Sequence, residues 1–104
     1  MIKFSTAIAL AEEQGACNDD MAVIRSMSGW EEFWAHPHAP YWSCWYVKDV
    51  IKGRWPDAEN VIMKDPVFAF WYASNIKGRW PEAEEVIRSD RLSWCLYSYF
   101  LIRH

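Results

Sequence analysis

The chain has 104 residues, the size of a single domain, so a two-domain enzyme is excluded. Hydrophobic residues make up 52% of it and charged residues 24%, which excludes an intrinsically disordered chain, and no uncharged apolar run reaches the roughly 18 residues of a membrane span. The net charge of −3 is too small to indicate a polyanionic partner. Aromatic residues are unusually frequent, at 17% with eight tryptophans, and this excess needs a structural or functional reason.

The N-terminal part predicts a pair of helices. Apolar residues recur with helical spacing in residues 4–14 and again in residues 19–27, and Gly15 separates the two segments. Residues 1–40 contain six acidic and two basic residues, a net charge of −4. We therefore expect an acidic surface in this part of the chain, formed by Glu12, Glu13, Asp19, Asp20, Glu31 and Glu32.

The start of the chain and its cysteines indicate a reducing compartment. Residues 1–4 lack the long apolar stretch of a signal peptide, so we expect a cytoplasmic protein without membrane association. Cys17, Cys44 and Cys95 are widely spaced and odd in number, which indicates neither a disulfide framework nor a zinc site. We expect them to be buried thiols that pack as small hydrophobic side chains.

His36-Pro37-His38 is the only local cluster of potential metal ligands or acid–base groups. In an extended loop the rings of His36 and His38 would point to opposite sides, which is poor geometry for a shared metal ion. We expect a solvated loop between helices and no metal site.

A 12-residue sequence occurs twice, with a period of 25 residues. Ile-Lys-Gly-Arg-Trp-Pro-Asp-Ala-Glu-Asn-Val-Ile at residues 51–62 returns in nearly the same form at residues 76–87, and eleven of sixteen positions are identical when 51–66 is aligned with 76–91. An acidic, Trp-containing turn upstream marks a decayed third copy. We expect one structural role for the three tryptophans that lie 25 residues apart, which are Trp30, Trp55 and Trp80.

Each copy carries the signals of a helix end followed by a helix start. Gly53 and Gly78 are predicted to adopt the left-handed conformation that ends a helix. Pro56 and Pro81 suit the first turn of the next helix, which the acidic residues after them stabilise. Short capped helices are therefore predicted within residues 56–62 and 81–87.

Asp65-Pro66 predicts the cap and first residue of a helix that contains the aromatic segment 67–73. Segments 42–47 and 92–97 align with it and are also apolar on nearly every side, so we expect neighbours on both sides of each helix. Strands are the alternative for these segments. The preferred interpretation is a single all-α domain of short stacked helix pairs, an α-solenoid-like array with units at about 4–28, 29–53, 54–78 and 79–104.

The repeat resembles those of a family of small phage and viral proteins. The resemblance is carried by Lys-Gly-Arg-Trp-Pro-Glu-Ala-Glu with Asp65-Pro66 and Tyr72-Ala73 between copies, and in the front half by Trp30-Glu31-Glu32 before the Trp-rich segment 42–47. It covers about residues 20–100 and implies a protein of a mobile element that binds and blocks a factor in the host bacterium's cytoplasm. An inhibitor of a bacterial defence complex, of the anti-CRISPR kind, is the implied function, and an immunity-type protein that neutralises a toxin would use the same mechanism.

Partner contacts are expected from the acidic N-terminal surface and from the last helix. Residues 92–102 are rich in apolar and aromatic side chains, and no further repeat follows to cover them. This helix is expected to fold back over the core or to form a homodimer seam, with binding of a host partner as the third possibility. The aromatic contacts predicted here are Trp94, Tyr97 and Tyr99.

Nucleic-acid binding is the alternative function, because basic residues beside tryptophans form the chemistry that stacks bases. The residues concerned are Lys52, Arg54, Lys77 and Arg79. In the competing structural interpretation, Arg and Glu pair across the interface between copies while Trp55 and Trp80 fill the space between units, and burial of their rings decides between the two. The chain has no nucleophile motif or phosphate loop, so we predict no enzyme activity and no cofactor.

Overall fold

The computed structural model describes residues 2–103, and every regular element in this range is a helix. The first half contains α1 (Phe4–Glu13), α2 (Asn18–Arg25), α3 (Trp30–Ala35), α4 (Ala39–Tyr46) and the π-helical turn η1 (Val47–Ile51). The second half contains α5 (Pro56–Ile62), α6 (Pro66–Tyr72), the π-helical turn η2 (Ala73–Lys77), the 3₁₀ turn η3 (Pro81–Ala83), α7 (Glu84–Arg88) and α8 (Arg91–Arg103). The all-α prediction is confirmed, and the strand alternative is wrong for the described residues.

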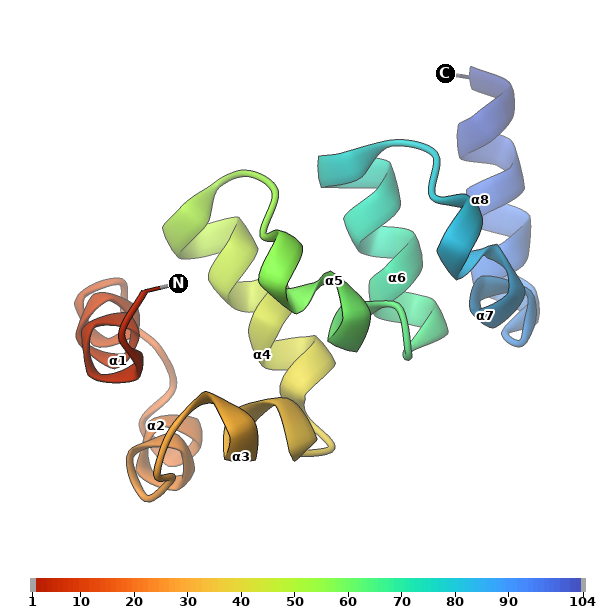
Figure 1. The fold of residues 1–104 in the computed structure, drawn as a ribbon. Helices are drawn as coiled ribbons and strands as arrows, with labels where there is room; N and C mark the ends of the chain where they lie inside the picture. The colour runs from red at the N-terminus through yellow and green to blue at the C-terminus, as the bar shows by residue number, and fades with distance from the viewer. Residues whose placement is uncertain (1, 104) are drawn as a thin grey trace.

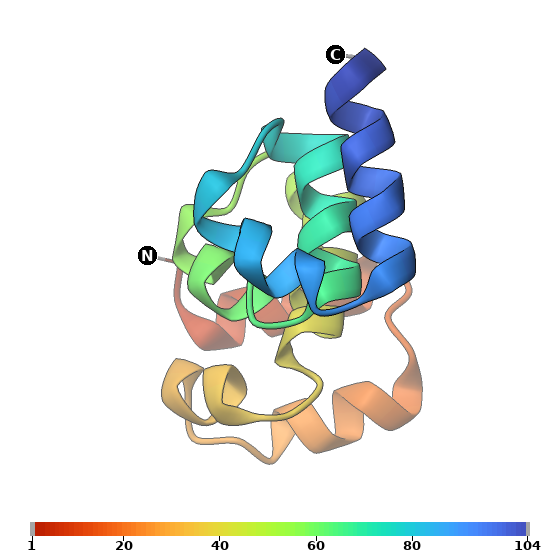
Figure 2. The same ribbon diagram turned by 90° about the vertical axis from the view of Figure 1, so that its right-hand side faces the viewer.

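The helices pack into an elongated body of 41 × 24 × 22 Å. Figure 1 shows α4, α6 and α8 side by side, with the short α5 and α7 beside them, while α1, α2 and α3 form the opposite end. The last turns of α8 project beyond the other helices (Figure 2). None of the helices in residues 2–103 has the length and apolar character needed to cross a membrane. The α-solenoid-like division into four units stays a prediction.

The predicted caps explain where several helices begin. Asp65 accepts hydrogen bonds from the backbone N–H groups of Val67 (2.9 Å) and Phe68 (3.2 Å), as expected for an N-cap before Pro66. Pro56 is the first residue of α5. Gly15 lies in the turn between α1 and α2 and has a φ of 84°. The segment predicted as a helix at 81–87 begins as a 3₁₀ turn before it becomes α-helical.

The two copies end their preceding helices at different residues. Gly78 has a φ of 92°, as predicted, but in the first copy Lys52 takes the left-handed conformation (φ 58°) and Gly53 does not. The two π-helical turns are closed by hydrogen bonds from different positions of the repeat. The N–H of Lys52 donates to the carbonyl of Val47 (2.6 Å), whereas the N–H of Gly78 donates to the carbonyl of Ala73 (2.7 Å). The first π-helical turn therefore closes one residue earlier relative to the repeat.

Aromatic side chains fill the core. Tyr72 and Tyr97 are fully buried, and Trp55 and Trp80 are 6% and 3% exposed. Trp30 is only half-buried and is the first residue of α3, where its indole N–H donates to the carbonyl of Ile2 (2.8 Å). The prediction of one shared role is therefore wrong for Trp30, while Trp55 and Trp80 do occupy equivalent places.

The cysteines do not behave alike. Cys44 is buried, and burial raises the pKa of its thiol to about 12, with a further contribution from the carboxylate of Asp65. Cys17 and Cys95 are exposed, so the prediction of three buried thiols is wrong for these two. Cys95 lies on the solvent-exposed side of α8, and Cys17 is the residue that immediately precedes α2.

Candidate functional site

A network of hydrogen bonds surrounds the backbone N–H of Trp55, and we call it the brace. Its side chains are Arg54, Glu59 and Tyr72. The hydroxyl of Tyr72 accepts from the backbone N–H of Trp55 (2.9 Å) and donates to Glu59 Oε2 (2.7 Å). Arg54 donates to both oxygens of Glu59, at 3.1 and 3.2 Å. The chain of contacts ties the turn before α5 to the buried face of α6.

The same brace recurs 25 residues later. The hydroxyl of Tyr97 accepts from the N–H of Trp80 (2.9 Å) and donates to Glu84 Oε2 (2.8 Å), while Arg79 Nε donates to Glu84 at 3.4 Å. Arg and Glu therefore pair within one copy, five residues apart, and the predicted pairing across the interface between copies is wrong. The recurrence of Glu and Tyr at the period of 25 was the sequence signal for the brace, and sequence reasoning missed the tyrosine.

The brace shifts the pKa values of its members. Burial raises the pKa of Glu59, but hydrogen bonds from Arg54 and Tyr72 outweigh burial and hold it below its ordinary value. The pKa of Tyr72 is raised to about 12, chiefly by burial and next by its hydrogen bond to Glu59. Burial also raises the pKa of Tyr97. Glu59 is thus held as a carboxylate and Tyr72 as a neutral phenol, the state that the hydrogen bonds require.

The basic residues of the alternative function belong to this structural unit. Arg54 and Arg79 are paired with glutamates, and the rings of Trp55 and Trp80 lie inside the core. Lys52 is exposed, and Lys77 Nζ lies 5.9 Å from the ring centre of Trp80. Base stacking needs an open ring face, so the burial of Trp55 and Trp80 favours the structural interpretation of the repeated turn.

The predicted acidic surface lies at the end of the molecule away from α8 (Figure 1). Glu12 pairs with Arg25, and Glu32 accepts from the hydroxyl of Ser28 (2.5 Å). Glu13, Asp19 and Glu31 are exposed, and Asp20 is half-buried in the wall of a cavity. The structure therefore does not bring the acidic residues together with the aromatic contacts predicted on the last helix.

Helix α8 presents two different faces. Tyr97 is fully buried, so the prediction that it contacts a partner is wrong, and Trp94 is half-buried beneath the guanidinium of Arg88, 4.6 Å from its ring centre. Tyr99 is 60% exposed, and its contact with a partner stays a prediction. Three other apolar residues of the segment predicted to lack a cover share this outer face at helical spacing with Tyr99, although the sequence did not single them out as contacts: Leu92, Leu96 and Ile102.

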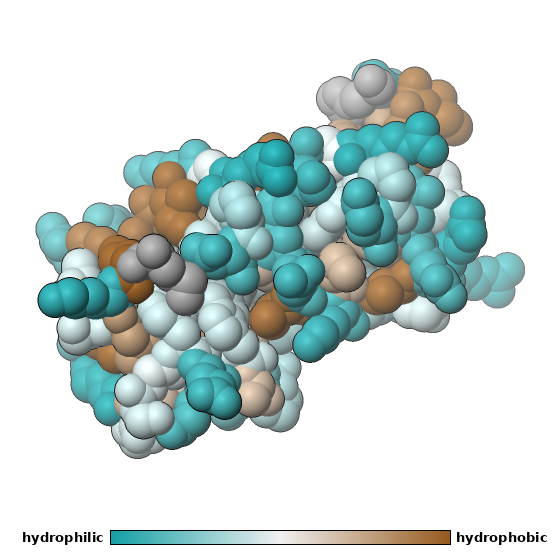
Figure 3. All heavy atoms as spheres, in the orientation of Figure 1, coloured by the Kyte–Doolittle hydropathy of each residue, from teal (hydrophilic) through white to brown (hydrophobic). Residues whose placement is uncertain are grey.

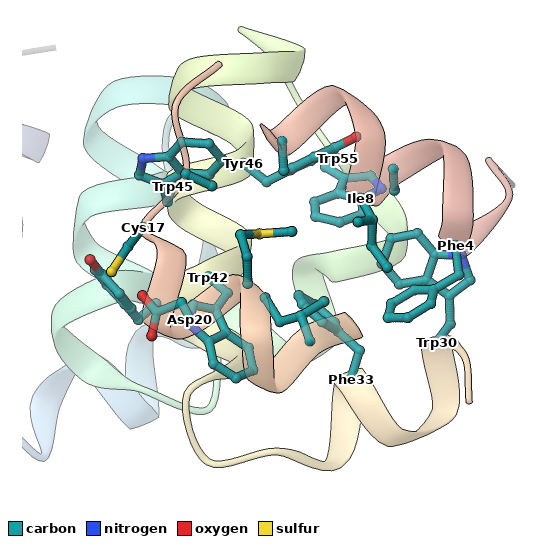
Figure 4. Close-up of a pocket in the computed structure, with 16 residues that line it drawn as sticks. Phe4, Ile8, Cys17, Asp20, Trp30, Phe33, Trp42, Trp45, Tyr46 and Trp55 are labelled. Carbon is teal, nitrogen blue, oxygen red and sulfur yellow. The ribbon is translucent and has the colours of Figure 1, made fainter. Parts of the chain in front are cut away.

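An apolar cavity of about 80 Å³ lies between α1, α2, α3 and α4. Figure 4 shows aromatic rings around it, among them Trp42 and Tyr46 of α4. The indole Nε1 of Trp42 and the hydroxyl of Tyr46 are buried without a hydrogen-bond partner in residues 2–103. No sequence pattern indicated this cavity, because its wall combines four separate helices.

The two histidines of the 36–38 loop lie on the same side, contrary to the prediction. The ring of His36 stacks on Trp42 with ring centres 4.4 Å apart, and the ring of His38 meets the same indole edge-on at 5.6 Å. The backbone N–H of His38 donates to His36 Nδ1 (3.0 Å), which folds the loop back on itself. Residues 2–103 contain no group of three or more potential metal ligands close enough to hold an ion.

Comparison with protein-family models, curated proteins and solved structures found no match to this chain.

Proposed function

We propose that this protein is a protein-binding module whose docking surface is the outer face of α8. The observation that carries the proposal is the exposure of four large apolar side chains on one helix, at spacings of three and four residues. Their exposed fractions run from 43% for Leu96 to 84% for Ile102. Figure 3 shows hydrophobic surface where the free end of α8 rises above the rest of the molecule. Contiguous exposed apolar surface of this kind is typical of interaction sites.

The charges around the stripe favour one kind of occupant. Arg88 is the last residue of α7, Arg91 is the first residue of α8 and Arg103 is its last, and residues 91–103 contain no acidic residue. We infer that the occupant is an amphipathic helix of another protein, with apolar residues along one face and acidic residues at both ends. A second copy of the chain is disfavoured, because antiparallel pairing of two α8 helices would bring Arg91 of one copy next to Arg103 of the other.

The partner class remains the one that the resemblance of the repeat implies. A host factor of a bacterial defence complex, bound and sterically blocked, is our proposal for the biological role. A toxin neutralised by an immunity-type protein would be held by the same surface. Neither role requires catalysis, cofactor or metal.

Two synthetic helical peptides test the docking chemistry. They share the same apolar positions, but one carries Glu at both ends and the other Lys. Fluorescence anisotropy is expected to show binding of the Glu peptide that weakens with salt, at least tenfold weaker binding of the Lys peptide, and loss of binding by Leu96→Glu. Val23→Glu is the matched control, because Val23 and Leu96 are both 43% exposed.

Three outcomes would overturn the proposal: equal binding of the two peptides, binding that survives Leu96→Glu, or no binding of either peptide. Light scattering of the full chain tests the other possible occupant, which is a second copy of the chain. A dimer at assay concentration that Leu96→Glu converts to a monomer would assign the surface to a second copy.

A further inference from the structure

We propose that the cavity between α1, α2, α3 and α4 binds a small apolar molecule that carries one hydroxyl group, such as an aromatic alcohol or phenol. The site is separate from the outer face of α8, and the two proposals stand or fall independently. Three features support it: the apolar character of the inner wall, two polar atoms without partners, and a lone carboxylate in the wall.

The inner wall favours an apolar ring. It is formed mainly by aromatic and aliphatic side chains, including Phe4, Ile8, Met21, Phe33 and Trp55. A volume of about 80 Å³ is roughly half that of an engineered apolar cavity that admits benzene. The cavity is not sealed, because its wall also includes the exposed Cys17 and the half-buried Asp20. A single ring therefore fits partly inside, with its substituent toward this opening.

The polar atoms select the substituent. Trp42 is 6% exposed, and its indole N–H has no acceptor in residues 2–103, which is costly for a buried donor. Figure 4 shows the carboxylate of Asp20 on the same side of the cavity as this nitrogen. The side chain of Asp20 forms no hydrogen bond or ion pair with another described residue. A ligand hydroxyl group at the opening donates to this half-buried carboxylate, which has no other partner in the described part of the chain.

The same carboxylate excludes anions. Asp20 is the one acidic residue in the wall, and no lysine, arginine or histidine lines the cavity to balance it. A ligand carboxylate placed at the opening would meet an unscreened like charge beside a low-dielectric wall. The expected order of affinity is an alcohol first, the matched hydrocarbon second and the matched carboxylate last.

Benzyl alcohol, toluene and benzoate form the matched set of probes, tested on the full chain by ¹H–¹⁵N NMR titration. We expect benzyl alcohol to bind at least tenfold more tightly than toluene and to shift the indole N–H signal of Trp42, while benzoate does not bind. Asp20→Ala is expected to reduce the affinity for benzyl alcohol to that for toluene. Asp19→Ala, an exposed acid next to it on α2, is the control and is expected to change nothing.

Alkylation of the two exposed cysteines locates the site. Benzyl alcohol is expected to slow the reaction of iodoacetamide with Cys17, which lines the cavity, and not with Cys95 on α8. Equal affinity for benzyl alcohol and toluene would mean that the cavity does not select a hydroxyl group, and this result would overturn the proposal. Absence of binding at millimolar probe, or equal protection of both cysteines, would overturn it as well.

Discussion

The two halves of the molecule treat their polar groups differently. In residues 52–103 the brace of Arg, Glu, Tyr and backbone N–H is built twice with nearly the same distances. In the first half the positions 25 residues before Arg54, Glu59 and Tyr72 are occupied by Gly, Trp and Val. None of these side chains is charged and none carries a hydroxyl group, so the guanidinium, carboxylate and phenol that form the brace are all missing there.

Aromatic rings replace the brace in the first half. Trp34, which stands where the later copy has Glu59, stacks on Trp30 with ring centres 5.1 Å apart and contacts Trp55 at 5.4 Å. Ring contacts are less directional than hydrogen bonds and do not satisfy polar atoms. The same half contains the cavity and the unpaired atoms of Trp42 and Tyr46. A repeat can therefore keep its helical spacing while exchanging paired polar groups for rings, at the cost of complete packing.

Truncation of a core isoleucine in each half is expected to have the largest effect on stability. Ile62 is fully buried in the second half, whereas Ile24 lines the cavity in the first. We expect Ile62→Ala to reduce the free energy of unfolding by about 3–5 kcal/mol and Ile24→Ala by about 2 kcal/mol, because Ile24 already borders open space. Urea denaturation measures both, with the matching Ile→Val variants as controls. Equal losses at the two sites would contradict a difference in packing.

Removal of one hydroxyl from each half gives the next largest effect. Tyr72→Phe leaves the buried N–H of Trp55 without an acceptor and deprives Glu59 of a donor, so we expect a loss of about 1–3 kcal/mol in the free energy of unfolding. Tyr97→Phe is expected to give a similar loss, because its contacts repeat those of Tyr72.

Tyr46→Phe is the matched control for these variants. Its hydroxyl is buried without a partner, so its removal is expected to be neutral or to stabilise the fold by up to about 1 kcal/mol. Urea denaturation of the three variants would refute the comparison if Tyr46→Phe proved as damaging as Tyr72→Phe.

Alkaline pH tests whether the brace holds Tyr72 as a neutral phenol. Its pKa is about 12 in the folded protein, whereas an unfolded tyrosine titrates near about 10. The unfolded chain therefore loses this proton first, so the stabilisation is complete below pH 10 and is lost as the pH rises toward about 12. We expect the free energy of unfolding to fall less steeply between pH 10 and 12 in Tyr72→Phe than in the wild type. Parallel curves for the two proteins would show that Tyr72 is not held neutral by the fold.

Local signals in the sequence predicted the local features of the fold. Asp65-Pro66, Pro56 and Gly15 mark helix boundaries in both sequence and structure, because caps and turns depend only on residues nearby. The shift of the left-handed residue to Lys52 could not be predicted, since it depends on how a π-helical turn closes onto Val47.

The candidate sites depend on which face of each helix meets a neighbour, and spacing alone does not tell this. Residues 92–102 were predicted to hold contacts, yet Tyr97 faces inward to Trp80 while Leu96 faces outward. The cavity was not predictable for the same reason, because Trp42 and Asp20 come from helices whose packing the sequence pattern does not specify.

Removal of an exposed ion pair is expected to have the smallest effect. Glu12 pairs with Arg25 between α1 and α2, and both side chains are more than 40% exposed. Water and salt screen such a pair, so Glu12→Gln is expected to lower the free energy of unfolding by no more than about 0.5 kcal/mol. Glu59→Gln removes a half-buried carboxylate that two partners hold, and its cost is expected to be several times larger. Urea denaturation at low and at high salt distinguishes them, because only the small effect at Glu12 should vanish at high salt. A loss at Glu12 as large as that at Glu59 would mean that the first half, too, depends on its polar pairs.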